Sequence, residues 1–328
     1  MQSIVSKKMG STESYGNRKI GIIGLGSIGR KHAICLFSLG VKNIIALRTK
    51  KGSKQELSPE VASIKEVYDY TTFFNCNLDG VLICNPTSLH LDAMNQCLER
   101  DIPIFVEKPV FSELEQSSYL IQGKSDNIMI GFCLRFHPII KKTHSLLHEN
   151  KVGKISFVKL EVGQYLPSWH PYTDYRTEYF SRKELGGGAL RTLSHEIDLM
   201  IHFFGTPLEF NTKALKVSEL EIDVDDYATV LAQYKNHRVE LSMDFITRKT
   251  KRTGSIVGNK GELQYDFIAQ KIDFTNNKGE TETIPFGTEE LYLSQMEDFL
   301  DFIKLGKTKG CTFEEAMETM KIIDAENK

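Results

Sequence analysis

Residues 20–29 have the sequence IGIIGLGSIG, in which a short apolar run ends in a glycine loop. A helical pattern follows, and a second short apolar run spans residues 43–47. This order of strand, G-x-G-x-x-G loop, helix and strand is typical of a βαβ unit that binds a dinucleotide. Gly24 would allow the tight turn, Gly26 would let the backbone approach a pyrophosphate, and Gly29 would permit close packing of the helix. A purely structural loop in an empty doubly wound fold is the alternative.

The alternation of strands and helices continues beyond this unit. The apolar pattern predicts three further strands and two helices, in chain order at residues 80–84 (strand), 89–98 (helix), 104–106 (strand), 111–122 (helix) and 128–132 (strand). Strands separated by helices imply a parallel, doubly wound sheet. We therefore expect an α/β Rossmann domain over residues 19–136, after a flexible extension at residues 1–18.

The pattern changes to longer strands with polar alternation in the second half of the chain. The predicted strands lie at residues 155–162, 228–234, 239–244, 254–257, 262–266 and 271–274. The predicted helices lie at residues 138–147, 189–204, 289–305 and 312–327. A hairpin turn at Asn236-His237 favours antiparallel pairing. We expect an α+β domain over residues 137–328 with a large, mostly antiparallel open sheet, whose helices from residue 289 pack back on the first domain.

Composition narrows the class of protein. The chain has 328 residues, 41 Lys plus Arg against 43 Asp plus Glu, and a net charge of −2, which argues against a nucleic-acid partner. No apolar run approaches the roughly 20 residues of a membrane span, and residues 1–17 hold no apolar segment typical of a secretory signal. The six cysteines are scattered without a C-x-x-C pair, which favours reduced thiols over a zinc site. We expect a cytoplasmic protein without a metal.

The end of the second strand bears on the choice of cofactor. Arg48 follows it, with Thr49, Lys50 and Lys51 next, and no carboxylate occurs before Glu56. An acidic residue in this region would bind a ribose 2′-hydroxyl, whereas a basic cluster suits a 2′-phosphate. The sequence therefore favours NADP(H) over NAD(H). A solvated basic loop, or an arginine that stacks on adenine, are the alternatives.

Two further motifs follow predicted strands of the parallel sheet. These are Asn85-Pro86-Thr87 and Glu107-Lys108-Pro109. Open α/β sheets bind ligands at the carboxyl ends of their strands, where a lysine can stabilise charge that develops on a reacting oxygen. A structural role for Lys108 fits the position equally well.

The predicted helix at residues 189–204 carries a polar stripe on an otherwise apolar surface. At about 100° per residue, Arg191, His195, Asp198 and His202 fall on one side. The stripe holds two histidines and no lysine or glutamate, which favours a site, although a plain solvated face is the alternative. His195-Glu196 does not begin a zinc-protease motif, because position 199 is leucine.

The motifs together resemble a known family. The glycine loop, Asn85-Pro86-Thr87, Glu107-Lys108-Pro109, residues 135–138 (RFHP) and Gly186-Gly187-Gly188 with residues 195–198 (HEID) occur in an order similar to the Gfo/Idh/MocA oxidoreductases. The resemblance covers residues 19–328. Residues 162–171, with 174–176 and 182–185, resemble a bacterial branch associated with surface-polysaccharide or amino-sugar biosynthesis.

The resemblance implies a catalytic pair, Lys108 and His195, and hydride transfer between nicotinamide C4 and a carbon of a sugar, amino sugar, nucleotide-sugar or acidic sugar. The residues expected at the cofactor are Gly24, Gly26, Ser27, Ile28, Gly29, Arg48, Thr49, Asn85, Pro86, His90, Glu107 and Lys108. The residues expected at the substrate are Arg135, Gln164, Tyr165, Trp169, Arg191, Thr192 and Asp198. Trp169 could stack on a sugar face or simply pack a long loop. A homodimer or homotetramer is also implied.

The chain departs from the family pattern near His195. Many relatives carry an aspartate three or four residues before this histidine, where Thr192 and Arg191 stand here. Either Asp198 substitutes for it, or Arg191 binds an anionic group of the substrate. The family also contains NAD-assisted enzymes of glycosidic cleavage or elimination, and a sensor that binds dinucleotide without turnover. These remain alternatives to a dehydrogenase.

Overall fold

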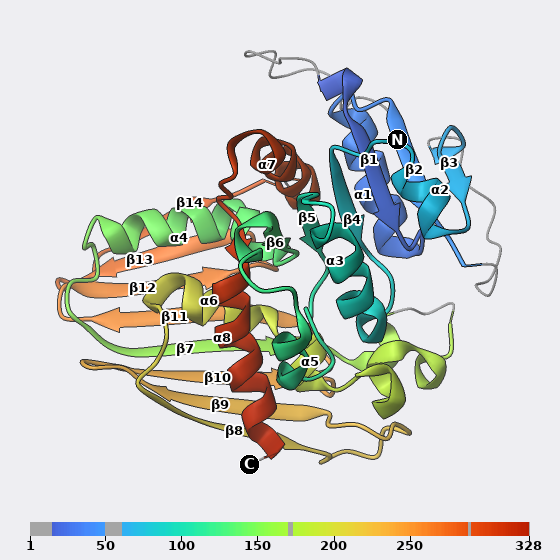
Figure 1. The fold of residues 1–328 in the computed structure, drawn as a ribbon. Helices are drawn as coiled ribbons and strands as arrows, with labels where there is room; N and C mark the ends of the chain where they lie inside the picture. The colour runs from blue at the N-terminus through green and yellow to red at the C-terminus, as the bar shows by residue number, and fades with distance from the viewer. Residues whose placement is uncertain (1–14, 50–60, 170–172, 288–289, 328) are drawn as a thin grey trace.

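The computed structural model describes residues 15–49, 61–169, 173–287 and 290–327. Most of the predicted extension at residues 1–18, together with Lys50, Lys51 and Glu56, lies outside these ranges. Figure 1 shows two sheets side by side, one built mainly from the first half of the chain and one from the second.

The first sheet is the expected doubly wound one. Its strand order in the described residues is β15-β6-β5-β4-β1-β2-β3, and every pairing is parallel except that of β15 with β6. The strands are β1 (Lys19–Ile23), β2 (Asn43–Leu47), β3 (Lys65–Val67), β4 (Gly80–Ile83), β5 (Ile104–Val106), β6 (Ile128–Ile130) and β15 (Cys311–Thr312). The predicted strands are confirmed. The short β3, which carries one buried residue, gave no apolar run to detect.

Helices cover both faces of this sheet. They are α1 (Ser27–Ser38), α2 (Tyr70–Phe74), α3 (His90–Leu98) and, from the end of the chain, α7 (Leu291–Leu305), which packs on α1. Shorter 3₁₀ turns are η1 (Tyr15–Asn17), η3 (Thr87–Leu89), η4 (Leu114–Tyr119), η5 (Ser125–Asn127) and η6 (Cys133–Phe136).

The helix predicted at residues 111–122 is wrong. Only the 3₁₀ turn η4 forms there, between the buried side chains of Phe111 and Leu120. The N–H of Leu114 donates to the carboxylate of Asp324 from α8, and the Gln116 side chain accepts from the N–H groups of Ser112 and Glu113. These contacts replace the bonds of a regular helix.

The second sheet is mostly antiparallel, as predicted. Its order is β14-β13-β12-β11-β7-β10-β9-β8, and only β7 and β10 pair in parallel. The strands are β7 (Ile155–Gly163), β8 (Glu209–Leu215), β9 (Tyr227–Gln233), β10 (Arg238–Asp244), β11 (Lys251–Gly258), β12 (Gly261–Asp266), β13 (Lys271–Asn276) and β14 (Thr281–Pro285). The hairpin around Asn236-His237 is confirmed. The edge strands β8 and β14 were missed because they are largely exposed and polar.

Helices of the second half lie over one face of this sheet (Figure 1). They are α4 (Pro138–His148), α5 (Ala189–Thr192), α6 (His195–Phe204) and α8 (Phe313–Asp324), with 3₁₀ turns η7 (Leu166–Ser168), η8 (Tyr175–Thr177), η9 (Tyr179–Ser181), η10 (Lys183–Leu185) and η11 (Ala325–Asn327). None of the helices in the described part of the chain combines the length and apolar character that a membrane crossing needs.

The helix predicted over residues 189–204 is broken between α5 and α6. The Thr192 carbonyl accepts a hydrogen bond from Lys108 Nζ at 2.9 Å. In a continuous helix this carbonyl would accept from the N–H of Glu196. That N–H instead donates to Leu193 O at 3.3 Å. The break therefore coincides with a contact from the first domain.

Candidate active site

The glycine loop has the geometry of a phosphate cradle. Gly24 has φ +95°, and a Cβ on it would lie 2.6 Å from the backbone N of Asn85. A Cβ on Gly29 would lie 2.2 Å from Gly24 O, whereas one on Gly26 would meet nothing within 4 Å. The helix α1 begins at Ser27, with Ile28 next, and no side chain caps it. Its first N–H groups are therefore available to an anionic group.

His90 holds two loops together beside this cradle. Its Nε2 lies 3.0 Å from Asn85 O and its Nδ1 lies 3.0 Å from Val110 O, and the side chain is buried. Burial lowers its pKa, against the effect of the two carbonyls. The family resemblance places His90 at the cofactor, but its ring contacts the backbone of the Asn85-Pro86 loop and of the turn after β5. It can act on a ligand only through those loops.

Glu107 is tied to α1 by a residue that sequence reasoning missed. Its Oε1 lies 2.6 Å from Nε2 of the buried His32, and its Oε2 accepts from the Lys108 N–H at 3.2 Å. His32 follows the last loop glycine by three residues, which is the one local signal that could have found it. The pair fixes the turn that carries Lys108 against the helix of the glycine loop.

Lys108 and His195 come together from the two halves of the chain. Lys108 reaches Thr192 O, one turn before His195, and the His195 ring lies edge-on to Phe132 with centroids 5.7 Å apart. Burial, with the charges of Lys108 and Arg252, lowers the pKa of His195 well below its usual value. The imidazole is therefore neutral near pH 7, and its Nδ1 has no partner among the described residues.

Arg252 is a second residue that sequence reasoning missed. It projects from β11, and its guanidinium binds the buried carboxylate of Glu196 at 2.7 and 3.2 Å. Its charge also lowers the pKa of His195. No local pattern could have joined Arg252 to Glu196, because 56 residues separate them.

Arg48 is not free, contrary to our expectation for a 2′-phosphate site. Its Nη1 lies 2.6 Å from Oε1 of Glu66, the middle residue of β3. Tyr68 donates to the other carboxylate oxygen at 3.0 Å, and Thr49 beside Arg48 is exposed. The prediction of NADP(H) assumed that no carboxylate stood here.

Arg135 and Asp198 form a buried ion pair instead of a substrate site. The guanidinium binds both carboxylate oxygens at 2.7 to 3.1 Å and also reaches Glu315 at 2.7 Å. Both side chains are almost fully buried. Asp198 therefore does not replace the missing aspartate beside His195, because its carboxylate is taken by Arg135.

Arg191 also has protein partners. Its Nη1 donates to Ser112 O at 2.7 Å and its Nη2 to Asp324 at 2.9 Å. The guanidinium thus links α5 to the segment after Pro109 and to the end of α8. These two contacts give Arg191 a structural role, which is the alternative to the predicted binding of an anionic substrate group.

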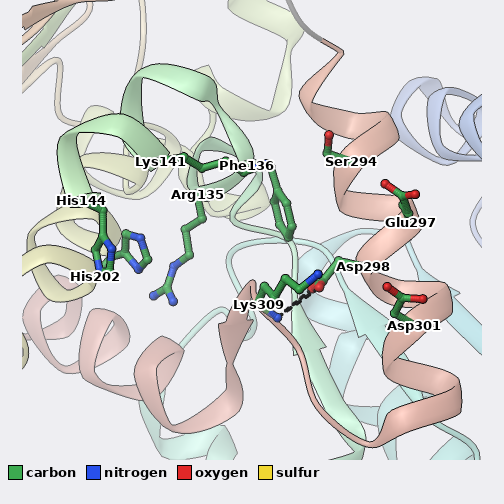
Figure 2. Close-up of a pocket in the computed structure, with 10 residues that line it drawn as sticks. All are labelled: Arg135, Phe136, Lys141, His144, His202, Ser294, Glu297, Asp298, Asp301 and Lys309. Atoms are coloured by element: carbon green, nitrogen blue, oxygen red, sulfur yellow. Dashed lines mark hydrogen bonds between the residues drawn. The ribbon is translucent and has the colours of Figure 1, made fainter. Parts of the chain in front are cut away.

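The fourth member of the predicted stripe, His202, lies on another surface. It stacks on His144 with ring centroids 4.8 Å apart, and both line a cavity of about 510 Å³. Figure 2 shows this cavity between α4, α6 and α7, with Arg135 on its wall. The backbone N–H of Lys309 donates a hydrogen bond to the Asp298 carboxylate there. No predicted catalytic residue lines it, so it is separate from the Lys108–His195 site.

The loop after β7 is packed by its aromatic residues. Trp169 lies edge-on to Phe180 and Phe245, with centroids 5.2 and 5.3 Å apart, and Arg248 stacks on Tyr165 at 3.6 Å. Gln164 is half-buried and held through its backbone N–H, which donates to Asp244 O. Packing explains the ring of Trp169, although its buried Nε1 has no partner in the described residues.

The residues present fit a dinucleotide and a polar substrate. Buried polar atoms without a described protein partner include Asn85 Oδ1, Thr192 Oγ1, Ser194 Oγ and His195 Nδ1. Buried polar groups ordinarily find partners, so these four atoms are available to water or to a bound ligand. Within the described ranges, no three His, Cys, Asp or Glu side chains are arranged to hold a metal ion.

Comparisons with known proteins agree with this architecture. Residues 18–127 match the model of the oxidoreductase family's NAD-binding Rossmann fold, and residues 144–326 match its C-terminal alpha/beta domain. Glucose-6-phosphate 3-dehydrogenase of Bacillus subtilis is 24% identical over 265 residues, which are 76% of this chain and 74% of the relative. Myo-inositol 2-dehydrogenase of Thermotoga maritima is 24% identical over 317 residues, 90% of this chain and 91% of the relative.

Solved structures share the fold. UDP-N-acetylglucosamine 3-dehydrogenase from Acidithiobacillus ferrooxidans has a TM-score of 0.74 at 17% identity, covering 93% of this chain and 95% of its own. An inositol dehydrogenase homologue from Azotobacter vinelandii, complexed with NAD⁺, has a TM-score of 0.78 at 13% identity and covers 97% of both chains. With its NAD-binding Rossmann domain and C-terminal alpha/beta domain, the chain belongs to the Gfo/Idh/MocA family of oxidoreductases.

Proposed function

We propose that the protein is an NAD(P)-dependent dehydrogenase that interconverts a hydroxyl and a carbonyl group on a sugar-like ring. The observation that supports the proposal is the hydrogen bond from Lys108 Nζ to Thr192 O, three residues before His195, together with the effect of the Lys108 charge on the pKa of His195. The names of the relatives, dehydrogenases of a sugar phosphate and of an inositol, support the substrate class.

The roles of the residues follow from their chemistry. A bound nicotinamide supplies or accepts the hydride at C4. Lys108 keeps two N–H donors beyond its bond to Thr192 O, and one of them holds the substrate oxygen. His195 accepts the hydroxyl proton during oxidation and returns it during reduction. Glu107 and His32 position Lys108, whereas Thr192 and Trp169 offer unpaired polar atoms to the substrate.

The electrostatics of His195 set the pH dependence. Because its pKa is lowered in the folded protein, the imidazole stays neutral, and competent as a base, below the ordinary histidine pKa of about 6.5. We therefore expect the acid limb of kcat/KM for oxidation to lie below about pH 6.5. A limb near neutrality would contradict this assignment.

Location and assembly stay proposals. We propose a cytoplasmic protein, because all six cysteines are free thiols in the structure, as a reducing compartment favours. We also propose a homodimer or homotetramer, on the family resemblance alone.

The test combines dinucleotide binding with turnover on a panel of sugars, inositols and their phosphates. We expect His195→Asn and Lys108→Met each to bind dinucleotide but to lose about 10²–10⁴-fold in kcat. Unchanged turnover in both variants would contradict the proposal. Binding without turnover of any panel member by the wild type would favour the sensor alternative, and copurified nicotinamide that does not exchange would favour the non-redox enzyme.

A further inference from the structure

We propose that Glu66 is a specificity-determining residue, which makes the site favour NAD(H) by occupying Arg48 and opposing a 2′-phosphate. The inference rests on the proposed dinucleotide-binding function and concerns this chain's own residues at the end of β2 and in β3.

The position of the pair follows from the strand register. The strands β2 and β3 run in parallel, with Ala46 opposite Glu66 and Leu47 opposite Val67. The chain keeps this pairing one residue further, because the Arg48 N–H donates to Val67 O at 3.0 Å. These positions lie at the carboxyl ends of the strands, where the glycine loop also lies. The Gly24 N–H of that loop donates to Leu47 O at 3.2 Å.

Rossmann domains bind the adenosine ribose at the carboxyl ends of these strands. In NAD-binding members the acidic residue about 20 positions after the glycine loop accepts from the 2′-hydroxyl, and in NADP-binding ones an arginine receives the 2′-phosphate. Here Arg48 stands 19 positions after Gly29, and the carboxylate comes from the neighbouring strand. The predicted ribose position therefore has both an arginine, Arg48, and a carboxylate, Glu66, beside it.

The contacts of Arg48 and Glu66 indicate which of the two charges a bound ribose would meet. The Arg48–Glu66 bond is 2.6 Å, and the side chains are only 14% and 21% exposed. Partial burial reduces solvent screening and strengthens the pair relative to a fully exposed one. Tyr68 holds the second carboxylate oxygen at 3.0 Å, which further fixes the carboxylate in place.

The charges then favour the unphosphorylated ribose. A 2′-phosphate would bring roughly −1.5 to −2 charges up to a carboxylate that already neutralises Arg48, and like charges at close range oppose binding. A 2′-hydroxyl can instead donate to a carboxylate oxygen. Glu66 therefore discriminates between the cofactors without being adjacent to Arg48 in sequence.

The experiment measures the dissociation constants of NADH and NADPH separately, by quenching of cofactor fluorescence. We expect the wild type to bind NADH at least about tenfold more tightly than NADPH. Glu66→Gln keeps the shape of the side chain and removes its charge. We expect this variant to lower the dissociation constant of NADPH about tenfold or more, while the dissociation constant of NADH changes by less than about threefold. Glu66→Asp, which keeps the charge, should stay close to wild type.

A matched control lies at the amino-terminal ends of the central strands β1 and β4, away from the glycine loop. Asp79 pairs with Arg18 at 3.1 Å there, so Asp79→Asn removes one carboxylate from an arginine pair without touching the ribose position. Its NADH to NADPH ratio should equal that of the wild type. Glu66→Thr, which suits a strand, is a second charge-removing variant should Glu66→Gln fold poorly.

Two outcomes overturn the inference. One is a wild type that binds NADPH more tightly than NADH. The other is a folded Glu66→Gln or Glu66→Thr protein whose ratio stays within twofold of wild type. Absence of binding of either dinucleotide to the wild type would overturn the proposed function as well, which distinguishes that failure from failure of the Glu66 role.

Discussion

The glycine loop and the α5–α6 segment lie in the same candidate site, but their contacts differ in origin. In the loop, the tightest constraint on Gly29 comes from Gly24 O, five residues away, whereas Gly24 itself meets the backbone N of Asn85. In α5–α6, Thr192 contacts Lys108, Glu196 contacts Arg252, and Asp198 contacts Arg135. These partners are 84, 56 and 63 residues away. A sequence motif therefore predicts the glycine loop well. The polar stripe of the α5–α6 segment does not predict which distant residue each of its side chains contacts.

The largest effect should come from Asp198, the residue that the stripe placed in the site. Asp198→Ala leaves Arg135 buried with one carboxylate partner fewer, and breaking such a pair costs about 3–5 kcal/mol of unfolding free energy. We expect kcat of the folded enzyme to change little. Urea unfolding and kinetics would check this, with the more exposed Asp79→Asn as a control expected to cost less than about 1 kcal/mol. A large loss of kcat at unchanged stability would return Asp198 to the active site.

The glycine loop offers a comparison within one motif. Gly29→Ala drives a Cβ to 2.2 Å from a backbone oxygen, so we expect about 1–3 kcal/mol of lost stability together with weaker dinucleotide binding. Gly26→Ala meets no atom within 4 Å, so its stability should stay within about 0.5 kcal/mol of wild type. Its affinity should still fall, because the Cβ occupies space that the cradle leaves open to the pyrophosphate. Equal stability losses in the two variants would contradict this reading of the loop.

Arg191 should give the smallest change. Arg191→Ala removes charge-assisted bonds to Ser112 O and Asp324, each worth about 1.5–3 kcal/mol at most when buried, and less here because both side chains are partly exposed. We expect a modest fall in thermal stability and unchanged KM for acidic and neutral substrates alike. A selective rise in KM for acidic substrates would restore the anion-binding role that the sequence suggested.

The strands of both sheets were largely predictable, because buried strands leave apolar runs such as residues 43–47 and 104–106. Strands whose side chains face solvent could not be predicted in this way. The strands β3, β8 and β14 carry few buried residues and therefore no apolar run. The wrong helix at 111–122 and the break in the helix predicted at 189–204 are both sites where another part of the chain takes over a backbone group. Asp324 binds Leu114 N–H and Lys108 binds Thr192 O, and neither partner is visible in the local pattern.

The candidate site divides in the same way. The motifs predicted Lys108 and His195 as a catalytic pair, which stays a proposal, and Lys108 bonds to the backbone at Thr192, three residues before His195. Composition near Arg48 suggested a bare basic cluster, yet Glu66 reaches it from β3, 18 residues further on. Arg135 and Arg191 were likewise interpreted as ligand-binding groups, but distant carboxylates pair with both. In this molecule, an arginine identified from sequence alone says little about a ligand until its carboxylate partner is known.

The most direct test of the central claim is a double-mutant cycle on Lys108 and His195, measured as kcat with bound dinucleotide. If both residues act on one substrate oxygen, the double variant Lys108→Met/His195→Asn should lose about as much kcat as the more impaired single variant. Independent losses that multiply in the double variant would show that the two residues do not act as one unit, and would rule out a shared role on one oxygen.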